Sequence, residues 1–376
     1  MLTTLLTLAL DFHQAKEKKY CYIRHMKVFA FLKSAKFFTI LAPCFMVYLV
    51  LGTLAQKYMG LHEATQSYFY SWTLWMHGIP LPGFLTLAVL LLLNLTLFSV
   101  TQNWQKKTYG LMFMHVGVIG LVLSMIFTPV WSTEGYISFK VGETVDTLTS
   151  YFEKEFIVEH NGETWAFNHD ALSETIHLKD TNWPFEVQIV EHCKNCEITA
   201  RKEGPVPFIG MGANMQLSPR TLELKAEENL SGLSFIVSED GAKTGFTLID
   251  AAPIPASTET AFFTLNKTQT NLPFSVTLNQ FKKTNYSGTD LAKSYMSDVT
   301  VVTHGGNKRA AIEMNNPLSV GDYTLYQSSV INSSSDTPVS VLAVVHNPLK
   351  EAPYIATALI AFGLLAHALQ KRRHRK

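Results

Sequence analysis

The run YGLMFMHVGVIGLVLSMIFTP, residues 109–129, decides the fold class, because it contains no Asp, Glu, Lys or Arg. A membrane-spanning helix needs about 20 mostly apolar residues. Residues 37–55, 84–101 and 352–370 form three further runs of this kind. Four buried helices of a soluble protein are the alternative, but they would not require apolar runs of this length. We therefore predict an integral membrane protein with four transmembrane α-helices.

The stretch between the third and fourth runs, residues 131–351, is polar and long enough to form a core of its own. Apolar and polar residues alternate within it, as in Phe185-Glu186-Val187. This period of two predicts half-buried strands. The dipeptide Gly305-Gly306 predicts a hairpin turn. We expect one large, mostly antiparallel β domain, either a sandwich or an open barrel.

Two of the alternating runs begin in the same way, with Trp183-Pro184-Phe185 and Leu272-Pro273-Phe274. The shared opening could mark a duplicated β unit, but coincidence is the favoured interpretation, because proline cannot donate to a strand ladder and is tolerated at the first residue of a strand. We therefore expect each of these prolines to open a strand.

The charges are divided unevenly along the chain. Residues 131–351 contain 16 Lys and Arg against 27 Asp and Glu, a net charge of −11, whereas the rest of the chain has a net charge of +12. The positive residues precede the first run, separate the second from the third (Lys106, Lys107), and follow the fourth. Because basic loops mark the cytoplasmic side, we predict a cytoplasmic segment at 1–36, an extracytoplasmic β domain and a basic cytoplasmic tail at 371–376.

The opening MLTTLLTLAL lacks the basic region and cleavage site of a signal peptide. Met26 begins MKVFAFLKSAK, in which basic residues directly precede the first apolar run. A start at Met26 would make residues 1–25 a mispredicted extension.

Cys193 and Cys196 are the cysteine pair whose spacing suggests a disulfide or thiol chemistry. Their setting, HCKNC, has its histidine ahead of the CxxC, whereas covalent haem attachment uses CxxCH. A structural disulfide is one interpretation. The other is a thiol-disulfide exchange pair, with Lys194 and His192 lowering a thiol pKa. The favoured interpretation is the disulfide, since a thioredoxin-like βαβ pattern is missing.

His115 lies inside the third apolar run, and an ionisable residue in a span suggests function by default. At about 100° per residue, Gly110, Gly117, Gly120 and Ser124 share one helix face, a small-residue seam suited to close packing. His115 falls on the opposite face, so we expect it to point away from the sister helices, toward a partner or a cofactor. It is a candidate axial ligand for haem; the alternative is a histidine hydrogen-bonded between helices.

His367 is a weaker candidate for a second ligand, with snorkelling at the membrane interface as its alternative. The aromatic run YFYSWTLW, residues 68–75, lies in the loop after the first helix and predicts either an interface belt or a partner surface. Nothing in the sequence resembles a phosphate loop, a catalytic triad or a zinc-protease motif. We expect neither catalysis by this chain alone nor a nucleic-acid partner.

Several motifs, in order, resemble the ResB (CcsB) family of System II cytochrome c biogenesis proteins. They are LGTLAQ (51–56), IPLPG (79–83), HVG (115–117), EGY (134–136), GET (142–144), LPFSV (272–276), YSGT (286–289), MNNPL (314–318) and DYTLYQSS (322–329). The resemblance extends over about residues 27–370 and implies a bacterial cytoplasmic membrane protein. No single motif is decisive, but their order and spacing make the resemblance strong.

The resemblance implies one subunit of a haem-handling cytochrome c synthase. With a CcsA-type partner, such a protein carries haem b transiently, without covalent attachment, and presents it to apocytochrome c. The family's third-helix histidine, a proposed haem ligand, corresponds to His115, and the partner would supply the second ligand. Two alternatives are an envelope thiol-disulfide factor, served by a thioredoxin-like reductant at Cys193 and Cys196, and a structural subunit without haem contact.

Overall fold

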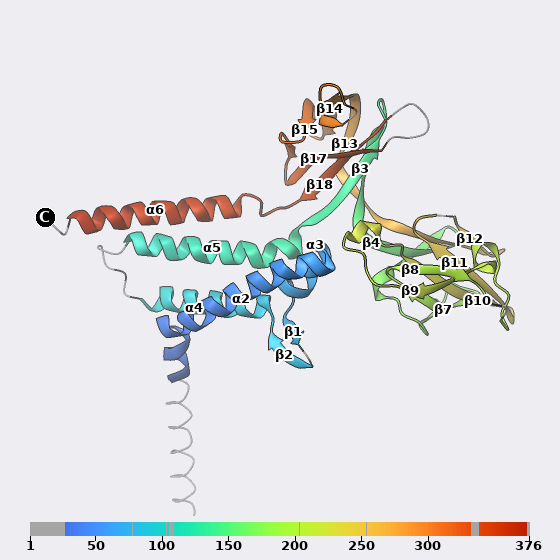
Figure 1. The fold of residues 1–376 in the computed structure, drawn as a ribbon, viewed down its shortest axis with the longest axis horizontal. Helices are drawn as coiled ribbons and strands as arrows, with labels where there is room; N and C mark the ends of the chain where they lie inside the picture. The colour runs from blue at the N-terminus through green and yellow to red at the C-terminus, as the bar shows by residue number, and fades with distance from the viewer. Residues whose placement is uncertain are drawn as a thin grey trace, which may run out of the picture. The chain divides into compact units, whose positions relative to one another are not determined.

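The computed structural model describes residues 27–76, 78–102, 104, 109–202, 204–252, 254–289, 291–331 and 338–373 (Figure 1). The segments 1–26 and 374–376 and the basic pair Lys106-Lys107 lie outside the described residues. The chain divides into two compact units, a helical one and a β one. The β unit comprises Lys57–His62 and Ser132–Asn347.

Four helices in the helical unit are long and apolar enough to cross a membrane. They are α2 (Ala35–Met59), α4 (Phe84–Thr101), α5 (Tyr109–Trp131) and α6 (Ala352–Arg373). Apart from a few polar residues such as Asn94, His115 and Ser124, their side chains are mostly apolar all round, which is typical of membrane-spanning helices. The predicted fold class, four spanning helices with an antiparallel β domain, is confirmed.

The glycine seam of α5 packs against α6. A Cβ on Gly117 would lie 2.6 Å from Cγ1 of Ile360 and 2.7 Å from the carbonyl oxygen of Ala356. A Cβ on Gly363 of α6 would lie 2.6 Å from the carbonyl oxygen of Gly110. Small residues on both helices therefore let the two backbones approach closely, which is how helices without a hydrophobic driving force associate in lipid.

The connection from α2 to α4 contains short elements of its own. These are α3 (Leu61–Ala64), a π-helical turn at Thr65–Phe69, and the strands β1 (Thr73–Met76) and β2 (Ile79–Pro82). The hydroxyl of Tyr48 on α2 donates to the carbonyl of Pro82, and Phe84 stacks on Phe45. These contacts attach the hairpin and the start of α4 to α2.

The β unit is built from antiparallel strand pairs. One sheet has the order β11-β10-β7-β6, and a ten-stranded sheet has the order β15-β14-β13-β4-β3-β18-β17-β16, with β5 on β4 and β12 on β13. The strands are β3 (Thr133–Phe139), β4 (Thr144–His160), β5 (Glu163–Asn168), β6 (His177–Leu178), β7 (Phe185–Cys193), β8 (Cys196–Ala200), β9 (Met215–Pro219), β10 (Gly232–Glu239), β11 (Ala242–Ile249), β12 (Ala256–Ser257), β13 (Ala261–Asn285), β14 (Ala292–Thr303), β15 (Gly306–Glu313), β16 (Leu318–Val320), β17 (Tyr323–Ile331) and β18 (Val339–His346).

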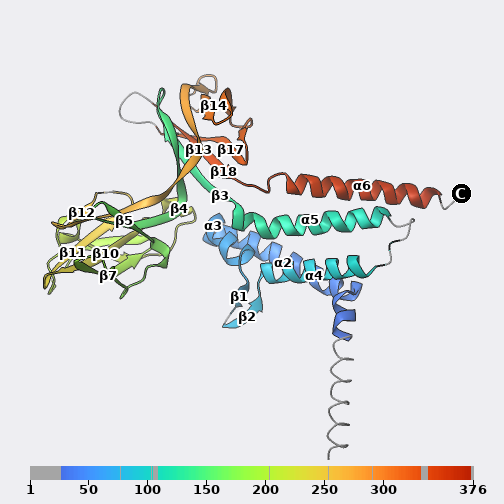
Figure 2. The same ribbon diagram turned by 180° about the vertical axis from the view of Figure 1, so that it is seen from behind.

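The unit has two separate hydrophobic cores, and the long strand β13 contributes to both. Its first half places Phe263 and Leu265 among the side chains of β4, β7, β10 and β11. Its second half places Val276 and Leu278 among those of β3, β14, β15, β17 and β18. One continuous strand thus contributes to both cores, and Figure 2 shows β13 running from one group of strands to the other.

Pro273 lies in the middle of β13 and does not open a strand, so that prediction is wrong. The pairing of β13 with β4 is irregular between Asn271 and Val276, and the pairing with β14 begins only at Ser275. Proline is accommodated in this interruption because no ladder hydrogen bond is required of it there. By contrast, Pro184 directly precedes β7, as predicted.

The hairpin predicted at Gly305-Gly306 is confirmed. Thr303 pairs with Gly306, so that His304 and Gly305 form the two-residue loop between β14 and β15. Gly306 has a φ of +121°, a backbone conformation that favours glycine.

Candidate functional site

His115 is held on α5 by a hydrogen bond and two aromatic rings. Its Nδ1 lies 2.8 Å from the carbonyl oxygen of Leu111, one turn earlier in the helix. The ring of Phe98 on α4 stacks on the imidazole, with centroids 5.2 Å apart. Trp104, just beyond α4, meets it edge-on at 5.8 Å and is itself fixed by donating to the carbonyl of Ser99 at 2.7 Å.

These contacts select one form of the neutral ring. A carbonyl oxygen can only accept, so Nδ1 carries the proton that is shared with Leu111. The lone pair of the neutral imidazole is then on Nε2. A metal-binding histidine commonly has this arrangement, with one nitrogen donating to a backbone carbonyl and the other binding the metal. The residues around His115 therefore fit an axial ligand.

The expectation that His115 points away from its sister helices is corrected by this geometry. The seam faces α6 and His115 lies on a different face, but that face is occupied by Phe98 of α4 and by Trp104. The imidazole is half-buried beside them. Sequence reasoning missed both aromatic residues; the available signal was a tryptophan placed shortly after the end of an apolar run.

His367 lies at the interface between α5 and α6. Its backbone packs on Gly110, where an added Cβ would come within 2.4 Å of the His367 nitrogen. Its Nδ1 is buried and has no hydrogen-bond partner in the structure. His115 and His367 are thus held at different interfaces of α5, and the structure does not bring them together as a pair of ligands.

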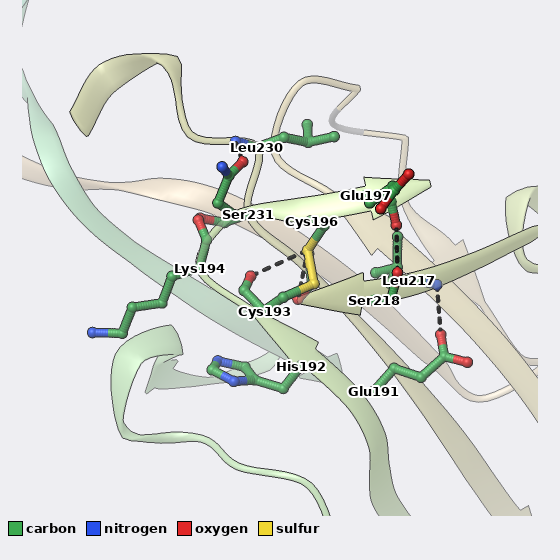
Figure 3. Close-up of a disulfide and its surroundings, with 12 residues drawn as sticks. Glu191, His192, Cys193, Lys194, Cys196, Glu197, Leu217, Ser218, Leu230 and Ser231 are labelled. Atoms are coloured by element: carbon green, nitrogen blue, oxygen red, sulfur yellow. Dashed lines mark hydrogen bonds between the residues drawn. A yellow bond between two sulfur atoms is a disulfide. The ribbon is translucent and has the colours of Figure 1, made fainter. Parts of the chain in front are cut away.

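Cys193 and Cys196 form a disulfide across the corner from β7 to β8, with their Cα atoms 5.3 Å apart (Figure 3). Both residues are buried, and they pack with Leu217 and Ile249 in a small apolar cluster. An exchange reaction needs a thiolate that can reach a sulfur atom of the disulfide. The burial of both sulfur-bearing residues favours a structural role.

Lys194 and His192 direct their side chains away from the sulfur atoms (Figure 3). The ammonium of Lys194 lies 2.8 Å from Asp170. The Nε2 of His192 donates to the carbonyl of His169 at 2.9 Å, and the two imidazoles are 4.4 Å apart. Burial and the neighbouring His169 lower the pKa of His192, while His169 and Lys194 hold the pKa of Asp170 well below its usual range.

A second polar cluster nearby was not predicted from the sequence. The guanidinium of Arg201 binds both carboxylate oxygens of Glu191, each at 3.1 Å, and lies over the ring of Phe208. Ser234 and Thr247 complete its hydrogen bonds. With its partners satisfied, this cluster stabilises the four-stranded sheet. In the described part of the chain, no group of three or more His, Cys, Asp or Glu residues is placed to hold a metal ion.

Comparison with known proteins places one region of the chain in a described family. Residues 244–340 match the ResB-like family, and they comprise strands from β11 to the start of β18. Protein NrfI of Wolinella succinogenes is 34% identical over 102 residues, which are 26% of this chain and 11% of that protein. This chain therefore matches only about a tenth of the length of that relative. The family match does not extend to His115, Cys193 or Cys196.

Proposed function

We propose that the chain is a ResB-like protein, as the match of residues 244–340 suggests, and that it acts in cytochrome c biogenesis as a membrane subunit that holds haem for delivery. Haem is the cargo in this proposal, bound transiently and not covalently. The β unit would then be the part of the chain that meets apocytochrome c.

The observation that carries the haem proposal is the orientation of His115. Its Nδ1 donates to Leu111, and Phe98 and Trp104 fix the plane of its ring. A bound haem would supply an iron that accepts the Nε2 lone pair. The aromatic side chains would offer apolar surface to a porphyrin beside that nitrogen.

We assign the second axial ligand to a CcsA-type membrane partner. His367 is held at the α5–α6 interface, where its backbone packs on Gly110. It is therefore poorly placed to complete a ligand pair with His115 inside this chain. Catalysis of thioether formation belongs in this proposal to the complex and not to this subunit alone.

The charge distribution supports an orientation in the bacterial cytoplasmic membrane. The net charge of −11 on residues 131–351 suits the outer side, and the basic residues flanking the helices suit the cytoplasm. Delivery to the side where the β unit lies is consistent with a client that matures outside the cytoplasm.

The test is to purify the chain with its partner and to record visible spectra. We expect a Soret band that is lost or shifted in His115→Ala and retained in the control His367→Ala, together with less covalently bound haem in membrane proteins of the His115→Ala strain. A Soret band unchanged in His115→Ala would contradict the assignment of this ligand. Normal covalent haem in that strain would favour a structural subunit.

A further inference from the structure

The hairpin of β1 and β2 exposes a set of large apolar side chains that the haem proposal does not use. Trp72 is 60% exposed, Trp75 68% and Ile79 62%, and Leu81 is also exposed. We name these four residues the Trp hairpin. No Asp, Glu, Lys or Arg occurs between Glu63 and Lys106, so none of these charged residues lies on the hairpin.

The hairpin of β1 and β2 carries apolar side chains on both of its faces: Leu74 packs partly on the α2–α4 cluster, while Trp75 is exposed on the other face beside the polar Thr73. Trp75 is paired with Pro80, and Leu74 is paired with Leu81. Directly opposed residues share a face and successive residues alternate between faces. A two-stranded hairpin in water is marginally stable and normally turns one polar face to the solvent. This one therefore suits an apolar or interfacial surrounding.

The hairpin is attached rigidly to the start of a membrane span. Gly83 and Thr86 of the first turn of α4 both donate to the carbonyl of Trp72, at 2.8 and 2.7 Å. Leu85 donates to the carbonyl of Ser71 at 3.2 Å. A Cβ on Gly83 would lie 2.3 Å from that Ser71 oxygen, so glycine is required at this joint.

The position of the hairpin relative to the helices follows from this attachment. Both Figure 1 and Figure 2 show β1 and β2 extending sideways from α2 and α4, across the helix axes and not along them. A segment that leaves the end of a span sideways runs along the membrane surface.

We propose that the Trp hairpin inserts into the boundary between lipid headgroups and acyl chains and anchors the end of α4 there. Tryptophan is enriched at that boundary because its ring is apolar while its N–H can bond to headgroups. Pro80 and Pro82 remove two donors from β2, which disfavours addition of a strand from another protein. Because the hairpin contains no Asp, Glu, Lys or Arg, a neutral lipid is sufficient. The proposal is independent of haem binding.

The test uses the full chain without any partner, in nanodiscs of phosphatidylcholine. Cys21 and Cys44 are replaced by serine, and a nitroxide is attached to Trp75→Cys or Ile79→Cys. Leu54→Cys on α2 is the lipid reference and Ile209→Cys in the β unit is the water reference, both at exposed positions. Accessibility to oxygen and to a water-soluble nickel complex is measured at each site.

We expect both hairpin sites to show severalfold lower nickel accessibility than position 209 and higher oxygen accessibility. Nickel accessibility equal to that of position 209 would overturn the proposal, as would protection that appears only when a partner protein is added. A milder variant, Trp72→Phe with Trp75→Phe, avoids new cysteines. Brominated phosphatidylcholine should quench its tryptophan fluorescence less than that of the unaltered chain, and equal quenching would also overturn the proposal.

Discussion

His192 is a half-buried imidazole whose protonation should weaken the β unit in mild acid. Burial and His169 lower its pKa in the folded state, so the unfolded chain takes up the proton first as the pH falls below about 6.5. Its contribution to stability is complete above that pH and is lost as the pH falls toward the folded pKa. The melting temperature, followed by near-UV circular dichroism, should fall from pH 7 to pH 5, and less steeply in His192→Gln.

The control for this prediction is Gln269→Asn, an exposed position of β13 without a titratable side chain. It should retain the slope of the unaltered chain. Asp170 titrates in a separate range: its pKa is held low by His169 and Lys194, so its contribution disappears only in stronger acid, below about pH 4. An identical slope in His192→Gln would show that another group causes the acid sensitivity.

The ion pair between Lys154 and Asp250 is the most buried charge pair described, with side chains 9% and 10% exposed and 2.6 Å between Nζ and Oδ2. Lys154→Met would leave the carboxylate of Asp250 without its charge partner. Removing one partner of a buried pair costs about 3–5 kcal/mol. Chemical denaturation should show this loss, and Lys154→Met with Asp250→Leu should recover much of it. A double variant as unstable as the single one would mean that packing, not charge, is responsible.

The contact between α5 and α6 depends on the absence of side chains at the seam. Gly117→Val would place atoms within 2.6 Å of Ile360 and 2.7 Å of the Ala356 backbone, so the helices must separate. The matched change Gly120→Ala meets only the Ala356 Cβ, at 3.3 Å, and should be mild. Disulfide cross-linking between cysteines placed on α5 and α6 should fall strongly in Gly117→Val and little in Gly120→Ala. Equal cross-linking in both variants would contradict the proposal that close packing at Gly117 holds α5 and α6 together.

The helices could be predicted from sequence because a single chain segment that crosses lipid must be helical and nearly all of its side chains must be apolar. A long apolar run without charged residues meets both conditions and is visible in the sequence. The strands were predictable only where one face is buried, as in Phe185–Cys193. The continuity of β13 was not, since Pro273 resembles a strand start and is accommodated by irregular pairing with a distant strand. Pairing across many residues is a property of the folded unit, and no local pattern encodes it.

The same limit applies to the candidate site. A helical wheel correctly placed the glycine seam and His115 on different faces of α5, because it depends only on residue spacing. It could not say which neighbour occupies each face. Phe98 belongs to another helix and Trp104 to the connection after it, so their stacking on His115 depends on how α4 packs on α5.

The β domain and the rest of the chain have net charges of opposite sign, and this difference predicts which side of the membrane each part occupies. Residues 131–351 have a net charge of −11 and the remainder +12, and basic segments are retained in the cytoplasm. With Cys21 and Cys44 replaced by serine, Ile209→Cys in the β unit should react with a membrane-impermeant maleimide in intact spheroplasts. Lys371→Cys, at the end of α6, should react only after lysis. The described residues contain four candidate spans, and an even number of spans would place both ends of the helical unit on one side. Labelling of position 371 in intact cells would contradict this orientation and remove the delivery route proposed for haem.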